Sequence, residues 1–266
     1  MKKFWRILKK VLLVATVLSA ACVFVIVLSS AIKKQNQLVC NSIQVKIDSD
    51  SGVGFLSDNE IKDKINYLNG GSTIGKRLPE LDLRKLEAEI KKNPFVKDAE
   101  IYMDQSQNMT VEVFQKRPIV RVINNDGVSY YIGENNDKIP LNDNFTPYVA
   151  IALGNVETHK DSKRDSTIQA ALYKMVQYIR KDEFLEAFVD QLYVKENGEM
   201  EIIPKVGGHI IRFGPVDDSM AEKFGRLKVF YTEGLRKMGW TKYKTIDLRY
   251  KDQLVCEKRD STNKKQ

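Results

Sequence analysis

The first 34 residues constrain this chain more than any other segment. An apolar run over residues 11–32 contains no charged side chain and follows a basic cluster in residues 1–10. At 1.5 Å of rise per residue, the run makes a helix about 33 Å long, enough to cross the roughly 30 Å hydrocarbon core of a bilayer. The sequence therefore predicts a transmembrane helix over residues 11–32.

The distribution of Lys and Arg around this run predicts its orientation. Five cations precede the run, and only Lys33 and Lys34 follow it closely. Because an excess of Lys and Arg stays on the cytoplasmic side, we expect residues 1–10 in the cytoplasm and everything after Ile32 outside it, beginning with a linker at 33–40. The alternative is a signal peptide cleaved near residues 29–31, although such apolar regions are usually only about 7–15 residues long.

The charge balance of the chain indicates no polyanionic partner. The net charge of +8 comes from 43 Lys and Arg against 35 Asp and Glu. Five of the cations lie in residues 1–10 and four in the polar tail at 258–266, so the middle is close to balanced. The basic excess therefore favours membrane topology and solubility over a nucleic-acid groove. The exported part, about 230 residues, is long enough for two domains.

Residues 41–117 show the pattern of a small domain with the element order β-α-α-β-β. Alternating apolar residues predict a strand over 43–47. Ser57 and Glu60 have the spacing of a capping box, so a helix should begin between them. Asp82 can cap a second helix, and two strands with alternating apolar residues follow that helix.

Residues 118–257 are rich in predicted strands and contain two long helices. Asp126 and Gly127 lie between two alternating apolar runs, which is a strong hairpin signal. A helix is expected over 168–179, where apolar residues recur at helical spacing, and a second hairpin over 191–203. The segment therefore predicts a mixed β-sheet with helices packed against it.

The carboxyl-terminal part combines the second long helix with a last strand. Ser219 and Glu222 repeat the capping-box spacing at the start of this helix. Alternation then predicts a final strand over 246–250, with Tyr250 on one face and Arg249 on the other.

The residue types needed for catalysis do not converge in this sequence. The two histidines, His159 and His209, have no second metal ligand at a usable spacing, and no exported cysteine has a histidine nearby. Cys40 and Cys256 could form a disulfide in an oxidising compartment, although they lie in different predicted domains. We therefore expect no enzyme activity, cofactor or metal.

Several segments along the chain have sequences that are typical of one known family. The segment from Asn93 to Ala99 resembles the passage from helix to strand in a POTRA domain. The other segments are, in order, Gln115–Val120, Tyr130–Ile132, Ile139–Leu141, Lys223–Leu227, Ile246–Tyr250 and Gln253–Val255. Together they resemble the bacterial cell-division family FtsQ/DivIB. The resemblance implies an α+β fold: an amino-terminal transmembrane helix, a POTRA domain (β-α-α-β-β) and a mixed β-sheet domain with two long helices.

The resemblance also implies a function. It describes a non-catalytic, single-pass scaffold in the plasma (inner) membrane at the division septum, which recruits FtsB together with FtsL and links early and late septal proteins. FtsB is expected to add a strand next to the last strand of the sheet, where Tyr250 and Leu254 would serve as anchors and Arg249 as a charge contact. Val255 is a further expected partner-binding residue. The POTRA domain could bind further division proteins. No small-molecule substrate is implied.

Two other classes of protein fit parts of the sequence. A POTRA-type chaperone of a protein translocation system would also bind by strand addition, but it would normally carry POTRA repeats, and one such domain is predicted here. A eukaryotic type II glycoprotein or glycosyltransferase would carry glycan on the acceptor triplets at Asn108 or Asn144. Its acidic metal-binding motif is matched only by residues 48–50, which precede the first predicted helix.

Overall fold

The computed structural model describes residues 38–48, 52–157 and 162–259, together with residues 16, 19 and 22–26. Residues 22–26 are helical, but most of the predicted transmembrane segment lies outside the described residues. Within the described part of the chain, no helix has both the length and the apolar character needed to cross a bilayer. The span over residues 11–32 therefore stays a prediction.

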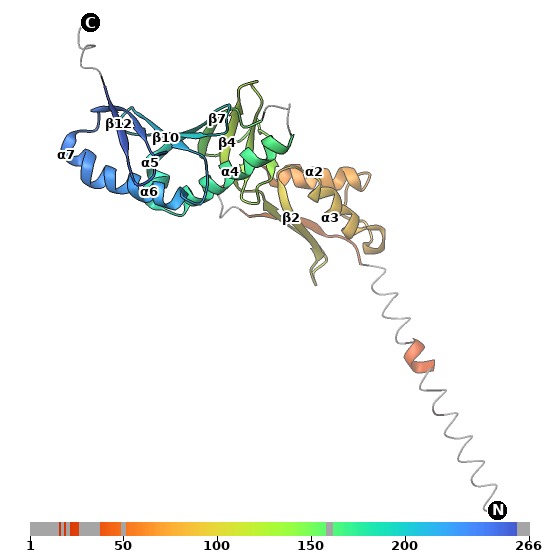
Figure 1. Cartoon of the computed structure of the whole chain (residues 1–266). Coiled ribbons are helices and arrows are strands. Elements are labelled where there is room, and N and C mark those ends of the chain that lie inside the picture. Colours follow the sequence, from red (N-terminus) through yellow and green to blue (C-terminus); the bar gives the residue numbers. More distant parts are fainter. Residues whose placement is uncertain are drawn as a thin grey trace, which may run out of the picture. The chain divides into compact units, whose positions relative to one another are not determined.

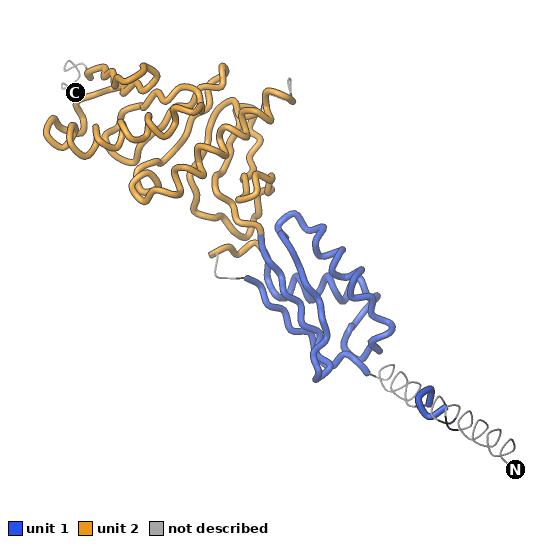
Figure 2. Tube along the Cα trace, turned by 60° about the horizontal axis from the view of Figure 1, so that its bottom comes forward, with its two compact units in different colours: residues 1–49, 56–115 blue, residues 50–55, 116–266 orange. Residues whose placement is uncertain are grey.

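The chain divides into two compact units, shown in different colours in Figure 2. The first contains residues up to 49 and 56–115, and the second contains 50–55 and everything from 116 onward. The short segment 52–55 thus leaves the predicted 41–117 domain. Its Phe55 is only 2% exposed and packs on Tyr131 and Phe145, with ring centroids 6.2 and 5.3 Å apart. This aromatic burial explains why the segment belongs to the second unit.

The first unit has the predicted order β-α-α-β-β, with a short 3₁₀ turn at Leu78–Glu80 between its helices. Its elements are β1 (Ser42–Ile47), α2 (Asp58–Leu68), α3 (Leu83–Lys91), β2 (Val96–Met103) and β3 (Asn108–Gln115). The sheet order is β1-β3-β2, with β1 parallel and β2 antiparallel to β3. Both helices bury their apolar sides against this sheet.

The side-chain caps that the sequence predicts at the starts of both helices in the first unit are confirmed. The backbone N–H of Glu60 donates to the Ser57 hydroxyl, and the backbone N–H of Ser57 donates to the Glu60 carboxylate, at 3.3 and 2.9 Å. Asp82 accepts a hydrogen bond from the N–H of Lys85 at 3.0 Å. Each contact satisfies a backbone donor that a helix start leaves unpaired.

The second unit is built on a nine-stranded mixed sheet in the order β12-β11-β10-β9-β8-β7-β4-β5-β6. Its strands are β4 (Pro118–Asn124), β5 (Ser129–Gly133), β6 (Lys138–Ile139), β7 (Ala150–Gly154), β8 (Val189–Val194), β9 (Met200–Pro204), β10 (Ile210–Gly214), β11 (Tyr243–Asp247) and β12 (Val255–Lys258). The central strands β4, β7 and β8 are parallel, as are β10 and β11. The predicted hairpins correspond to β4–β5 and β8–β9.

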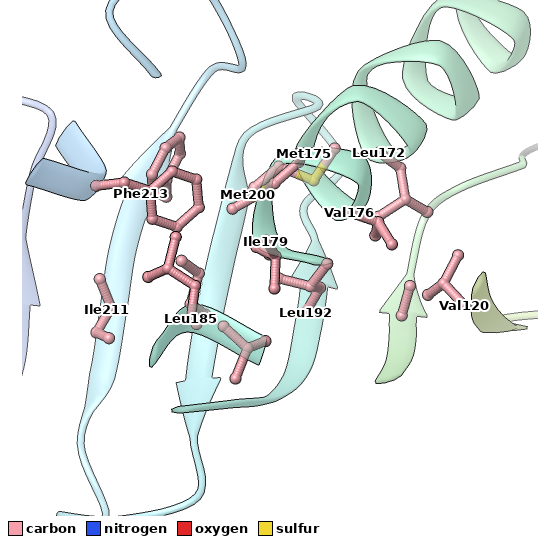
Figure 3. Packing of buried hydrophobic residues seen from close by; sticks show 14 of the residues in the cluster. Val120, Leu172, Met175, Val176, Ile179, Leu185, Leu192, Met200, Ile211 and Phe213 are labelled. Carbon is pink, nitrogen blue, oxygen red and sulfur yellow. The ribbon is translucent and has the colours of Figure 1, made fainter. Parts of the chain in front are cut away.

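Helices cover one face of this sheet (Figure 1). They are α4 (Ser162–Arg180), α5 (Glu183–Phe188), α6 (Met220–Val229), a π-helical segment η2 (Phe230–Leu235) and α7 (Arg236–Met238). They lie within the two long crossovers that parallel strands require, β7 to β8 and β10 to β11. Figure 3 shows Met175 and Ile179 of α4 packed with Leu192 and Met200 of the sheet in the main core. The predicted α+β class is confirmed.

The predicted capping box at Ser219 and Glu222 is wrong. The Ser219 side chain makes no cap bond to the helix; its backbone N–H and hydroxyl both donate to the carboxylate of Asp217 instead. Asp217 takes both hydrogen bonds because its carboxylate reaches the backbone N–H of the residue two positions later, so the serine hydroxyl is not available to cap the helix. Helix α6 therefore starts from an Asx turn rather than from a box.

Candidate partner-binding edge

The carboxyl-terminal edge of the sheet is formed by β12, not by a strand that contains Tyr250. β11 ends at Asp247, and β12 pairs antiparallel with it in the register Asp247 to Val255. The predicted final strand over 246–250 is therefore displaced by three residues toward the carboxyl terminus, because β11 covers Tyr243–Asp247. The N–H of Arg249 donates to the Asp247 carboxylate at 3.1 Å, which turns the chain out of the sheet.

The outer side of β12 presents backbone groups that no described strand pairs with, because β12 is the last strand of the sheet. The N–H of Arg259 donates inward to the carbonyl of Lys242 at 3.0 Å. Along an antiparallel strand, successive residues direct their backbone groups to opposite sides. Glu257 therefore faces inward like Arg259, whereas Cys256 and Lys258 direct their N–H and C=O groups outward. This edge can accept an added strand.

Arg249 is engaged inside the chain rather than held free for a partner. Its Nη2 lies 2.7 Å from the Asp247 carboxylate, and its Nη1 lies 3.4 Å from Glu199 on the β8–β9 turn. Burial raises the pKa of Asp247, but the hydrogen bonds from Arg249 outweigh it and hold that pKa below its usual value. The stem of Arg249 lies over Gly214, where a Cβ would come within 2.7 Å of it. Arg249 thus shapes the loop after β11.

The other predicted site residues differ in exposure. Tyr250 is 52% exposed and Val255 44% exposed, whereas Leu254 is half-buried against the main core. The loop that carries Tyr250 is held by Arg226 of α6, whose Nη1 donates to the Tyr250 carbonyl at 2.8 Å and whose guanidinium reaches two further carbonyls of the loop. The backbone of Tyr250 is therefore fixed while its ring is available to a partner.

Arg226 and the outward backbone of β12 were not predicted as parts of the site. Arg226 does lie within Lys223–Leu227, one of the segments that resemble FtsQ/DivIB, and that is the one sequence signal that could have drawn attention to it. Cys256, which was considered for a disulfide with Cys40, is a free thiol half-buried on β12, and Cys40 is free and buried in the first unit. His159 lies outside the described residues.

A buried histidine lies beside the far end of β12. His209 is 1% exposed, and its Nε2 is hydrogen bonded to the hydroxyl of Tyr231. The neighbouring carbonyl of Gly208 accepts a hydrogen bond from Arg259 at 2.6 Å. Burial is the main cause that lowers the pKa of His209, and the positive charge of Arg259 lowers it further. Hydrogen bonds to the backbone of Gly207 and Trp240 raise the pKa, but they do not outweigh the burial.

Acidification from pH 7.5 to 5.5 should destabilise the second unit through His209. Because the unfolded imidazole titrates near 6.5 and the folded one lower, the unfolded chain binds more protons as the pH falls below about 6.5. Stability should fall by up to about 1.4 kcal/mol per pH unit until the folded pKa is reached. Urea unfolding at both pH values checks this, and a loss in His209→Gln equal to that in the parent chain would contradict it.

A POTRA-like unit followed by a mixed sheet with an exposed edge strand is the architecture of a protein-binding scaffold. A family model described as FtsQ/DivIB, C-terminal related, matches residues 117–257, and a POTRA-like domain model matches residues 38–114. The first match alone covers more than half of the chain, which therefore belongs to the FtsQ/DivIB family. Both families are generally scaffolds rather than enzymes. No curated protein matches the chain significantly.

Proposed function

We propose that this chain is a non-catalytic, single-pass membrane scaffold of the cell-division complex that recruits FtsB together with FtsL. The FtsQ/DivIB family is generally membrane-associated at the septum, and the basic residues before 11–32 support a cytoplasmic amino terminus with the two units outside. A fluorescent fusion in growing cells tests the assignment. Bands at midcell are expected, and a uniform envelope signal would favour a translocation chaperone instead.

Two observations carry the proposal: no described strand pairs with the outer side of β12, and the ring of Tyr250 is exposed on the loop that leads into β12. Strand addition obtains affinity from main-chain hydrogen bonds and specificity from side chains beside the edge. Cys256 and Lys258 supply the outward backbone groups, and Tyr250 and Val255 supply apolar surface. Arg249 acts here by holding the loop through Asp247, and its second contact to Glu199 is long enough to exchange for a partner carboxylate.

Tyr250→Ala is expected to weaken binding of an FtsB peptide by about 2 kcal/mol, about thirtyfold in Kd. The ring is the largest exposed apolar group on the loop, while Arg226 fixes the backbone independently of the side chain. The full chain in nanodiscs, titrated with labelled peptide, provides the measurement. Tyr148→Ala is the matched control, because Tyr148 is 95% exposed on the same unit and lies near β7.

The control variant should bind like the parent chain. Unchanged affinity in Tyr250→Ala would remove Tyr250 from the site, and absence of binding by the parent chain would reject FtsB as the partner.

A further inference from the structure

One end of the first unit is tied closely to the predicted membrane span. Only residues 33–37 lie between Ile32, the last residue of that span, and Leu38, the first described residue of the folded unit. Because an extended chain covers at most about 3.3–3.6 Å per residue, the Cα of Leu38 lies no more than about 20 Å from that of Ile32. Any segment that is bonded to residues 38–40 is therefore held near the lipid surface.

The proximal segment, residues 66–77, is bonded to this part of the chain. It comprises the last turn of α2 and the loop that follows the helix. The backbone N–H of Cys40 donates to the carbonyl of Lys76 at 2.9 Å, and the N–H of Gly75 donates to the carbonyl of Cys40 at 2.8 Å. These bonds place the proximal segment at the end of the unit from which the predicted anchor leaves.

Two large side chains of the proximal segment are open to solvent. Tyr67 is 79% exposed and Ile74 is 54% exposed. The side-chain oxygen of Asn66 accepts a hydrogen bond from the N–H of Thr73 at 3.0 Å, and Asn69 donates to the hydroxyl of Thr73 at 2.8 Å. Because Asn66 and Thr73 are the direct neighbours of Tyr67 and Ile74, these bonds hold the two exposed side chains in one part of the surface.

The charge of the proximal segment is compatible with an anionic lipid surface. Residues 66–77 contain Lys76 and Arg77 but no Asp or Glu. Glu80, which follows the segment, pairs with Arg77 at 3.5 Å, and Asp104 of the β2–β3 turn accepts hydrogen bonds within that turn. The apolar groups therefore decide what the segment contacts. Tyrosine is enriched where lipid headgroups meet acyl chains, because its ring is apolar and its hydroxyl is polar.

We propose that the proximal segment rests on the outer surface of the membrane, with the side chains of Tyr67 and Ile74 between the headgroups and the acyl chains. This contact rests on the proposed function, since only an anchored chain keeps the segment at the bilayer. Two side chains alone would bind a bilayer weakly. The covalent anchor gives the lipid surface a high effective concentration, so that a weak contact is still populated. The contact sets the height of the first unit above the membrane.

Tryptophan reporters in the full chain test the proposal. Ile74→Trp and Tyr67→Trp are each made in a Trp5→Phe, Trp240→Phe background, which contains no other tryptophan. The chain is placed in nanodiscs whose phosphatidylethanolamine and phosphatidylglycerol carry bromine, a contact quencher, on their acyl chains. Fluorescence of both reporters should fall about twofold or more relative to unbrominated lipid, because interfacial side chains reach the acyl chains.

Phe114→Trp in the same background is the matched control. Phe114 is 38% exposed on the same unit and lies near the far end of β3, six residues after Asn108. Asn108 pairs with Ser42, next to the membrane-proximal residues, so Phe114 lies about 20 Å further along the strand. Its reporter should not be quenched. In the Tyr67→Trp reporter, Ile74→Asn should reduce the quenching about twofold, because less apolar area holds the segment at the lipid. Phe114→Asn should leave the quenching unchanged.

The outcomes separate this contact from the proposed function. If the chain enters nanodiscs but neither reporter of the proximal segment is quenched, or if Phe114→Trp is quenched equally, the contact is overturned and the anchored scaffold stands. If Ile74→Asn and Phe114→Asn change the quenching alike, the contact is overturned as well. A chain that does not enter nanodiscs has no membrane anchor, which rejects both the membrane scaffold and the contact.

Discussion

Gly154→Ala should destabilise the second unit by about 3 kcal/mol. Gly154 ends β7 with φ of +105°, and a Cβ there would lie 2.3 Å from the backbone carbonyl oxygen of Val194 on β8. The left-handed backbone costs a side chain roughly 1 kcal/mol or more, and moving a packed backbone away costs roughly 1–3 kcal/mol further. Because Gly154 and Val194 are register partners in the parallel pair, the strain falls on the centre of the sheet.

Gly127→Ala is the matched control for this prediction. Gly127 also has a positive φ, +86°, but a Cβ there meets nothing within 4 Å. Its substitution should therefore cost about 1 kcal/mol, the backbone cost alone. Urea unfolding followed by the fluorescence of Trp240, with Trp5→Phe as background, reports on the second unit. Equal losses in the two variants would show that the approach of Val194 does not govern the stability of this position.

The first unit could be predicted from sequence because its signals are local. Ser57 and Glu60 bond each other across one turn, and Asp82 reaches the N–H three residues onward, so each contact is encoded within a short window. The segment 150–154 gave no comparable signal. It forms β7, a central strand flanked by β4 and β8, and its continuous apolar run lacks the alternation by which half-buried strands are recognised.

The sequence predicted the region of the candidate edge but not where its strands begin and end. Alternation through Tyr250 suggested one continuous strand, and Leu248 is buried as that pattern requires. The carboxylate of Asp247 nevertheless captures the N–H and guanidinium of Arg249, which ends β11 early. The contact from Arg226 joins residues more than twenty positions apart, so no local pattern could place it. The family resemblance located the region, and tertiary contacts determine its geometry.

Lys258→Pro should strongly weaken the proposed strand addition at β12 while leaving the fold intact. The N–H of Lys258 faces outward, and its side chain is exposed, so the substitution removes only a donor that a partner would use. Loss of that bond, together with the bulk of the ring at the edge, should weaken an added FtsB strand about a hundredfold, which is about 2.7 kcal/mol. Peptide titration of the full chain measures this effect, and thermal unfolding should change little.

Glu257→Pro, one residue earlier, should lower the stability of the fold as well as partner binding. The N–H of Glu257 faces β11, where Glu257 pairs with Thr245. Without this N–H, β12 loses a backbone hydrogen bond to β11, which should lower the free energy of unfolding by about 2–3 kcal/mol. Partner binding should also be lost, because β12 is then no longer held at the edge of the sheet. The two variants therefore separate the outward from the inward backbone of β12. If proline at Lys258 lowered stability as much as proline at Glu257, or left FtsB binding unchanged, the outer side of β12 would not be the docking edge.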